Sequence, residues 1–155
     1  MGTVHGITSL VLLALAMLVG LIGVALEAPT AALVYTLVLG IAFLVICAAY
    51  CAKCPGRTQA CGHLLPGLVA QYLPARRQTP YNTTDLALTA LALAAMVCYP
   101  QFWMWQHPAL LALFWLLTTG AVLQIVLRVC RRCQNPHCPM KKGTMGIRSW
   151  RADTP

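Results

Sequence analysis

The chain alternates between long apolar runs and short polar segments. A first run at residues 7–26 contains no charged residue, and a second run at 30–50 begins directly after Pro29. Two further apolar runs occupy residues 86–103 and 109–127. Because an α-helix rises about 1.5 Å per residue, about 20 apolar residues cross the hydrocarbon core of a bilayer. The pattern therefore predicts four transmembrane helices.

The composition agrees with a membrane protein. Of the 155 residues, 59% are hydrophobic and only 9% are charged, and the mean hydropathy is +0.72. A typical soluble domain has about 25% charged residues. We therefore expect an all-α integral membrane protein with one membrane domain over residues 1–155. The first run lacks the basic start of a cleavable signal peptide and leads directly into the second, so we interpret it as a retained span.

The positive charges are confined to two segments. All eleven Lys and Arg residues lie in the central segment 51–85 or in the C-terminal segment 128–155. Because positively charged loops are retained on the cytoplasmic side, we expect both segments and both termini to be cytoplasmic. The expected fold is a four-transmembrane-helix bundle, and its expected location is a prokaryotic plasma membrane.

Two halves of the chain match when they are offset by 79 positions. The offset aligns one proline and two cysteines: Pro29 with Pro108, Cys51 with Cys130, and Cys54 with Cys133. We therefore expect two helical hairpins arranged as parallel repeats about an axis along the membrane normal. The alternative is chance similarity between apolar helices, because apolar matches are common in such a composition.

Six of the eight cysteines form two groups, each directly after a predicted hairpin. The groups are Cys51, Cys54 and Cys61 in the central segment, and Cys130, Cys133 and Cys138 in the C-terminal segment. Both groups are expected to face the cytosol, where structural disulfides are rare because thiols are kept reduced. The groups are therefore interpreted as thiols that bind metal or carry out redox chemistry.

The spacing within each group favours a metal site. Each group begins with a C-x-x-C motif, which places two thiols on one face of the last helical turn. Cys61 and His63 complete a tetrahedral zinc set in the first group, and Cys138 or His137 supplies further ligands in the second. The motifs leave open whether there are two sites or one site shared by Cys51, Cys54, Cys130 and Cys133.

Two other uses of the same cysteines remain open. An iron–sulfur cluster takes the same ligands, and Cys-Pro steps at Cys54 and Cys138 occur in some ferredoxin motifs. A thiol–disulfide relay is the second alternative. The remaining cysteines, Cys47 and Cys98, are interpreted as small apolar fillers of the helices. Zinc is the expected cofactor, with an iron–sulfur cluster as the alternative.

The rest of the chain offers no catalytic constellation. Its only carboxylates are Glu27, Asp85 and Asp153, and no acid–base pair, nucleophile triad or phosphate loop can be assembled from the sequence. His107, which lies among aromatic residues, is interpreted as an interfacial histidine, with a haem or pigment ligand as the alternative. A helix expected near residues 64–73 either lies on the inner membrane surface or packs over the bundle.

The expected function is therefore non-enzymatic. We expect a small membrane scaffold or accessory subunit whose cytoplasmic face is organised by metal bound to Cys and His. The alternative is an electron-transfer or thiol-redox protein that uses the same cysteines. The expected partners are the lipid bilayer, anionic lipid at the basic cytoplasmic face, and another protein or further copies of this chain. No nucleic-acid partner is expected, because no binding motif is present.

Overall fold

The structure is a computed structural model that describes residues 2–54, 64–74 and 81–130. Over these residues the fold is all-helical. The helical elements are α1 (Gly2–Glu27), α2 (Pro29–Ala49), the 3-10 turn η1 (Cys51–Lys53), α3 (Leu64–Tyr72), α4 (Thr83–Met104), α5 (Pro108–Gln124) and the π-helical turn η3 (Ile125–Val129). Four of these helices, α1, α2, α4 and α5, are long and apolar enough to cross a membrane. The prediction of an all-α membrane protein with four candidate spans is therefore confirmed.

Proline begins the second helix of each hairpin. Pro29 occupies the first turn of α2, and Pro108 occupies the first turn of α5. Proline suits this position because its fixed φ is already helical and its missing N–H would have no partner there. A single residue, Ala28, joins α1 to α2. The chain therefore reverses direction within a very short connection.

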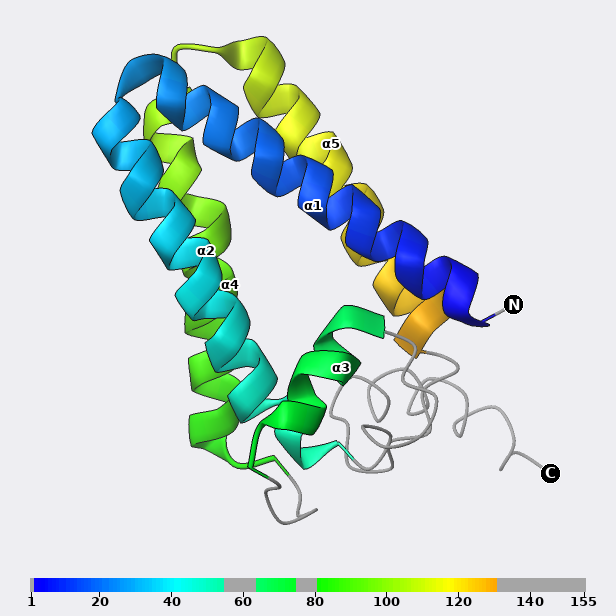
Figure 1. Ribbon diagram of the computed structural model, residues 1–155. Coiled ribbons are helices and arrows are strands. Elements are labelled where there is room, and N and C mark those ends of the chain that lie inside the picture. The colour runs from blue at the N-terminus through cyan, green and yellow to red at the C-terminus, as the bar shows by residue number, and fades with distance from the viewer. Residues whose placement is uncertain (1, 55–63, 75–80, 131–155) are drawn as a thin grey trace, which may run out of the picture.

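The four long helices form two pairs that diverge from a common end (Figure 1). Helix α1 packs along α5, which we name the α1/α5 leg, and α2 packs along α4, which we name the α2/α4 leg. The two hairpin turns meet at the apex, and the legs separate towards the open end, where α3 lies. The expected bundle of four helices therefore takes the form of two helix pairs.

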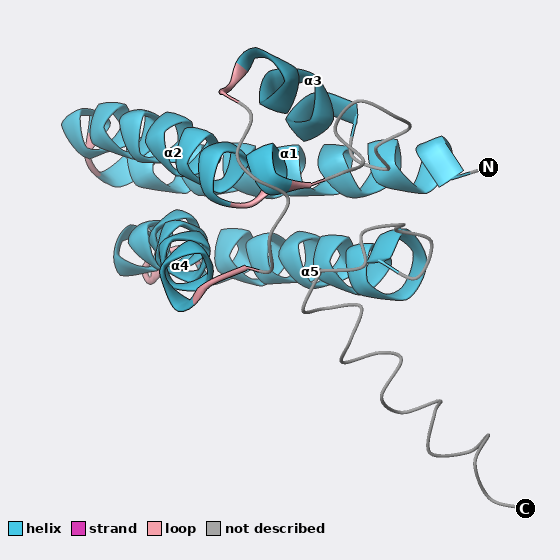
Figure 2. Cartoon of the chain, turned by 90° about the horizontal axis from the view of Figure 1, so that it is seen from below, coloured by secondary structure: helices cyan, strands magenta, loops and turns pink. Residues whose placement is uncertain are grey.

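The legs also form two layers (Figure 2). Helices α1 and α2 lie in one layer, and α4 and α5 lie in the other. Each leg consequently contains one helix from each hairpin. A two-fold rotation about an axis through the apex would exchange the two hairpins and, at the same time, the two legs.

The main core combines residues from both hairpins. Its buried residues are Ala16, Met17, Ala42, Ala92, Met96, Met104 and Phe114. The Tyr35 hydroxyl donates a hydrogen bond of 2.9 Å to the Met96 carbonyl oxygen and also lies 3.4 Å from the Met17 sulfur. This bond links α2 to α4 at a fully buried position. It also satisfies a hydroxyl that would otherwise be unpaired, since a bilayer offers no water to bond to it.

Several buried positions follow the predicted repeat. Three pairs of residues that are 79 positions apart are buried in both halves: Met17 and Met96, Tyr35 and Phe114, and Ala42 and Ala121. The long helices also begin and end at nearly equivalent positions, since α5 begins 79 residues after α2. These matches support the repeat, which remains a prediction.

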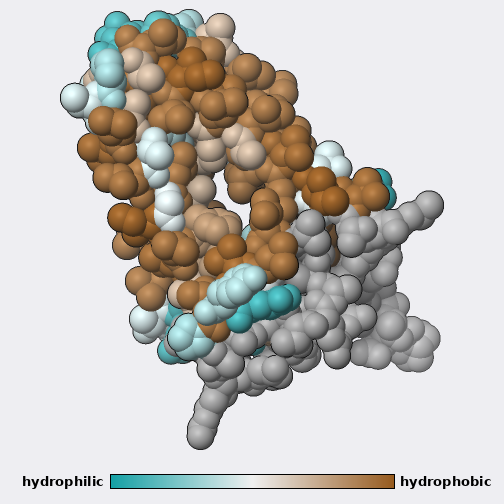
Figure 3. All heavy atoms as spheres, viewed as in Figure 1, coloured by the Kyte–Doolittle hydropathy of each residue, from teal (hydrophilic) through white to brown (hydrophobic). Residues whose placement is uncertain are grey.

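The outer surface of the legs is strongly apolar. Figure 3 shows hydrophobic residues over the visible face of both legs, with hydrophilic residues gathered at the apex and at the open end. Between 17% and 33% of the residues in each candidate span are buried within the chain. Most span positions are therefore not fully buried by the chain itself.

Candidate metal centre

The first C-x-x-C motif lies at the end of α2. Cys51 begins the turn η1, and the Cys54 backbone N–H donates a hydrogen bond of 3.0 Å to the Cys51 carbonyl oxygen. Cys54 itself is extended, with φ of −72° and ψ of 126°. This is the conformation expected of a residue before proline, here Pro55. The first motif therefore lies at the end of a helix that is long and apolar enough to cross a membrane, with Cys54 just beyond the last turn.

The second motif begins at the end of α5. The π-helical turn η3 continues α5, and Cys130 follows it with helical backbone angles. Single π-helical turns within α-helices are often found at functional sites. Cys130, like Cys51 and Cys54, is half-buried. The other predicted ligands, Cys61, His63, Cys133, His137 and Cys138, lie outside the described residues.

The described residues do not by themselves assemble a metal site. No group of three or more His, Cys, Asp or Glu side chains positioned for a metal occurs within residues 2–54, 64–74 and 81–130. No disulfide joins two of the cysteines in these ranges. Cys51 and Cys54 end the α2/α4 leg, whereas Cys130 ends the α1/α5 leg. Cys51 and Cys54 thus share one end of the molecule with Cys130 but lie on a different leg.

Cys47, which lies one helical turn before the first motif, contacts it. Its side chain is fully buried and is hydrogen-bonded to Cys51, one helical turn further along the chain. The filler interpretation of Cys47 therefore omitted a thiol contact at the edge of the motif. Cys98, on α4, is exposed on the surface of its helix.

A buried ion pair, which the sequence analysis missed, joins the first motif to α4. The Lys53 ammonium, located between Cys51 and Cys54, donates a hydrogen bond to the Asp85 carboxylate. The side chains are 7% and 2% exposed. The positive charge of Lys53, which lies between the two thiols of the motif, is thus compensated by this carboxylate. The pair holds the end of α2 against the start of α4.

Asp85 has a second role at the start of α4. The Asn82 side chain accepts a hydrogen bond of 2.8 Å from the Asp85 backbone N–H, and the Asp85 carboxylate accepts one of 3.3 Å from the Asn82 N–H. This reciprocal capping box pairs backbone donors that the first helical turn leaves unpaired. The sequence "NTTD" was the available signal for this cap.

Two tyrosines strengthen the same junction. The rings of Tyr50 and Tyr81 stack with their centroids 4.4 Å apart, and the Tyr81 hydroxyl donates a hydrogen bond of 3.1 Å to the Tyr50 carbonyl oxygen. The end of the α2/α4 leg therefore combines an ion pair, a helix cap and an aromatic stack. The sequence could not reveal the ion pair or the stack, because their partners lie about 30 positions apart.

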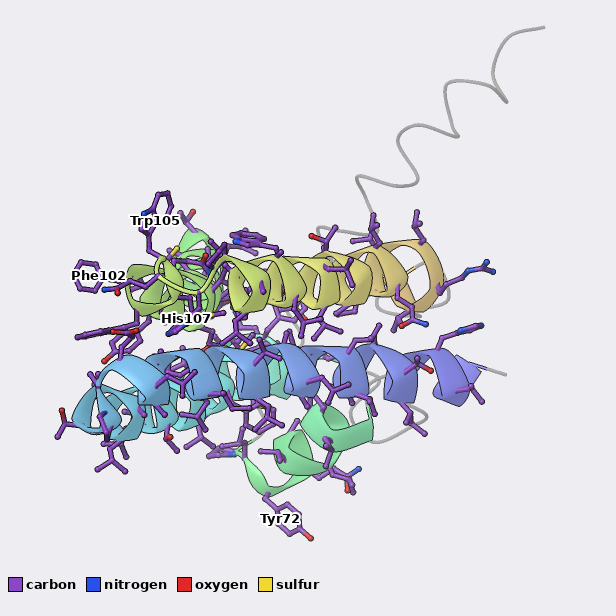
Figure 4. All side chains as sticks on the ribbon, turned by 90° about the horizontal axis from the view of Figure 1, so that it is seen from above. Tyr72, Phe102, Trp105 and His107 are labelled. Atoms are coloured by element: carbon purple, nitrogen blue, oxygen red, sulfur yellow. The ribbon has the colours of Figure 1, made fainter. Side chains whose placement is uncertain are left out.

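Helix α3 lies on the outer side of the layer formed by α1 and α2 (Figure 2). It contacts α1, α2 and η1, and Ala70 is fully buried in that contact. Its opposite side exposes Leu65, Leu68 and Tyr72, and Tyr72 points away from the other helices (Figure 4). The two expectations for this segment are thus compatible: α3 packs over the helices and also presents an apolar face outward.

An apolar groove adjoins η1. It has a volume of about 180 Å³ and is lined by Ala48, Ala52, Leu73 and Pro74. The absence of charged or hydrogen-bonding side chains in its lining gives the groove no means of orienting a polar substrate.

At the apex, a polar contact links the two hairpin turns. The His107 ring nitrogen Nε2 lies 2.9 Å from the Glu27 carboxylate oxygen Oε1. Nearby, Phe102 and Trp105 are each 80% exposed and project away from the helices (Figure 4). His107 was predicted to lie at the membrane interface, and its contact with Glu27 was not predicted.

Comparison with known proteins identifies no relative. No protein-family model, no curated protein and no solved structure matches the chain.

Proposed function

We propose that this chain is a membrane scaffold or accessory subunit whose cytoplasmic face is organised by metal, most simply structural zinc. The observation that carries the proposal is the position of the two C-x-x-C motifs, since each begins where the second helix of a hairpin ends. Thiolates are preferred zinc ligands, and a closed site of four Cys or Cys and His ligands is typical of structural zinc.

The proposed orientation places this end in the cytoplasm. The positively charged residues lie in segments that begin at this end, and positively charged loops remain cytoplasmic during insertion. A basic setting also offsets the negative charge of thiolates bound to a metal. Both support a site that acts on the cytoplasmic side.

The subunit role rests on the exposed surface of the spans. The helices are apolar all round, and most of their span residues are not buried within the chain. Association with another membrane protein or with copies of this chain would cover part of this surface.

Metal analysis combined with a visible spectrum tests the proposal. Protein purified anaerobically in mild detergent should contain zinc and show no visible absorption, because zinc is spectroscopically silent. A brown protein that contains iron and sulfide would instead support the electron-transfer alternative. Less than about half an equivalent of either metal per chain would refute the metal-organised face.

A further inference from the structure

Helix α3 buries small residues and exposes large ones. Gly67 and Ala70, three positions apart, are buried. Leu65, Leu68 and Tyr72 are exposed, and their spacing of three and four residues places them on one face of the helix, which we name the outward face. A helix that packs on a protein in water normally buries its large apolar residues. The arrangement in α3 is the reverse of the one expected for a helix surrounded by water.

The length of α2 indicates the depth at which α3 lies. Helix α2 has 21 residues, which rise about 31 Å in total and so match a hydrocarbon core about 30 Å thick. Directly beyond α2 come the turn η1 and the buried ion pair of Lys53 and Asp85. Helix α3 contacts η1 as well as α1 and α2. In a bilayer that α2 crosses, α3 therefore lies where the hydrocarbon meets the headgroups.

The outward face of α3 continues the apolar surface of the candidate spans. Helix α3 lies alongside the open end of the layer formed by α1 and α2 (Figures 1 and 2). At the same end of the molecule, Val4 and Ile7 of α1 and Leu44 of α2 are also exposed. Tyr72 is 90% exposed and points away from all of these helices (Figure 4). The medium that surrounds the spans at this end therefore also meets the outward face of α3.

From this geometry we propose that the outward face of α3 docks into the lipid of the leaflet at the open end, at the boundary between acyl chains and headgroups. Burial of Leu65 and Leu68 in this boundary removes apolar surface from water. Tyr72 suits the same depth, because its ring is apolar and its hydroxyl can reach the headgroups. Since α3 contacts α1 on one leg and α2 on the other, its docking holds the open ends of both legs at one depth. The proposal does not depend on a metal.

Fluorescence quenching of the full chain in vesicles tests the proposal. One environment-sensitive fluorescent amino acid replaces Leu68 in one variant and Tyr72 in another, and each protein is reconstituted in vesicles of phosphatidylcholine and phosphatidylglycerol. The control variant carries the fluorophore in place of Leu37, which is exposed near the middle of α2. Lipids with a nitroxide near the headgroup should quench the fluorophore at positions 68 and 72, and iodide in the water should not. Lipids with a nitroxide deep in the acyl chain should quench it at position 37.

Two results would overturn the proposal. Quenching at positions 68 and 72 by iodide but by neither nitroxide lipid would show that water covers the outward face. Protection of both positions from iodide and from both nitroxide lipids would show that protein covers it, either a second copy of the chain or another partner. A further variant, Leu68→Asp with the fluorophore at position 72, should lose nitroxide quenching and gain iodide quenching, because a charge at the membrane boundary opposes docking. Unchanged quenching in this variant would contradict a docked α3.

Discussion

The two legs bury residues at matching positions, such as Tyr35 and Phe114, but differ at the open end. The end of the α2/α4 leg is fixed by the ion pair of Lys53 and Asp85 and by the stacked rings of Tyr50 and Tyr81. The α1/α5 leg instead contains the π-helical turn η3. It also contains two buried polar atoms, on Thr118 and Gln124, that have no hydrogen-bond partner.

The two halves of the chain therefore differ in the polar contacts at the open ends of the legs. Residue Gly6 of α1 stands 79 positions before Asp85, so the α1/α5 leg has no carboxylate at the equivalent position. Removing one partner of a buried ion pair leaves the other charge uncompensated and lowers stability. Removing a buried hydroxyl that has no partner raises stability, because the unpaired hydroxyl is itself unfavourable. The same kind of substitution should therefore have opposite effects on the two legs.

The largest expected effect comes from breaking the ion pair. Lys53→Met alone or Asp85→Leu alone should lower the free energy of unfolding by about 3–5 kcal/mol, because each leaves a buried charge without its partner. The double variant should be more stable than the sum of the two losses predicts, since it leaves no unpaired charge. Unfolding of the purified protein in detergent measures all three. Strictly additive losses would show that the pair is not coupled.

The next effect concerns close packing at the apex. A Cβ added at Gly23 would lie 2.6 Å from the Met104 Cγ atom, and Met104 is fully buried. Gly23→Ala should therefore cost about 1–3 kcal/mol of stability through overpacking. Gly40→Ala on α2 is the matched control, because a Cβ there meets no atom within 4 Å. Equal stability of the two variants would contradict the apex packing.

On the α1/α5 leg, removing a polar group should have the opposite sign. Thr118 is 6% exposed, and its hydroxyl has no partner. Thr118→Val keeps the side-chain shape and removes an unsatisfied group, so we expect a gain of about 1 kcal/mol in the same unfolding measurement. Thr36→Val on α2 serves as the comparison, because the Thr36 hydroxyl donates to the Ala32 carbonyl oxygen. A loss of stability for Thr118→Val would mean that its hydroxyl is paired.

The smallest effect tests the equivalence of the halves. Tyr35 and Phe114 occupy matching buried positions and differ by one hydroxyl. Tyr35→Phe should cost about 0.6 kcal/mol, a typical value for a hydrogen bond between helices in a membrane protein. Its unfolding midpoint in detergent, compared with that of the original protein, measures this loss. A cost above about 3 kcal/mol would show that the hydroxyl does more than bond to the Met96 carbonyl.

Hydropathy predicted the spans because four runs were long enough and lacked charge. It could not predict which helices pair. The spans are apolar on all sides, so no polar face distinguishes a helix surface that packs against protein from one that faces lipid. Pairing instead depends on residues such as Gly23 and Tyr35, whose contacts come from distant parts of the chain.

For the candidate site, as for the spans, the sequence predicted the position along the chain but not the contacts between helices. The C-x-x-C spacing and Pro55 located the first motif at a helix end, and the structure places it there. Sequence reasoning could not find the ion pair of Lys53 with Asp85, because its partners are brought together only by the packing of α2 on α4. The contact of Cys47 with Cys51 had a signal in the four-residue spacing, which also fits an ordinary buried cysteine.

The most direct test of the metal-organised face is the alkylation of individual cysteines in native membranes, with and without a permeant chelator. Metal-bound thiolates are protected from alkylation, whereas released thiols react. We predict that Cys51, Cys54 and Cys130 react slowly before chelation and rapidly after it, with the reactivity of Cys98 unchanged, as read by mass spectrometry of the peptides. Equal reactivity of Cys51, Cys54 and Cys130 before and after chelation would contradict the proposal.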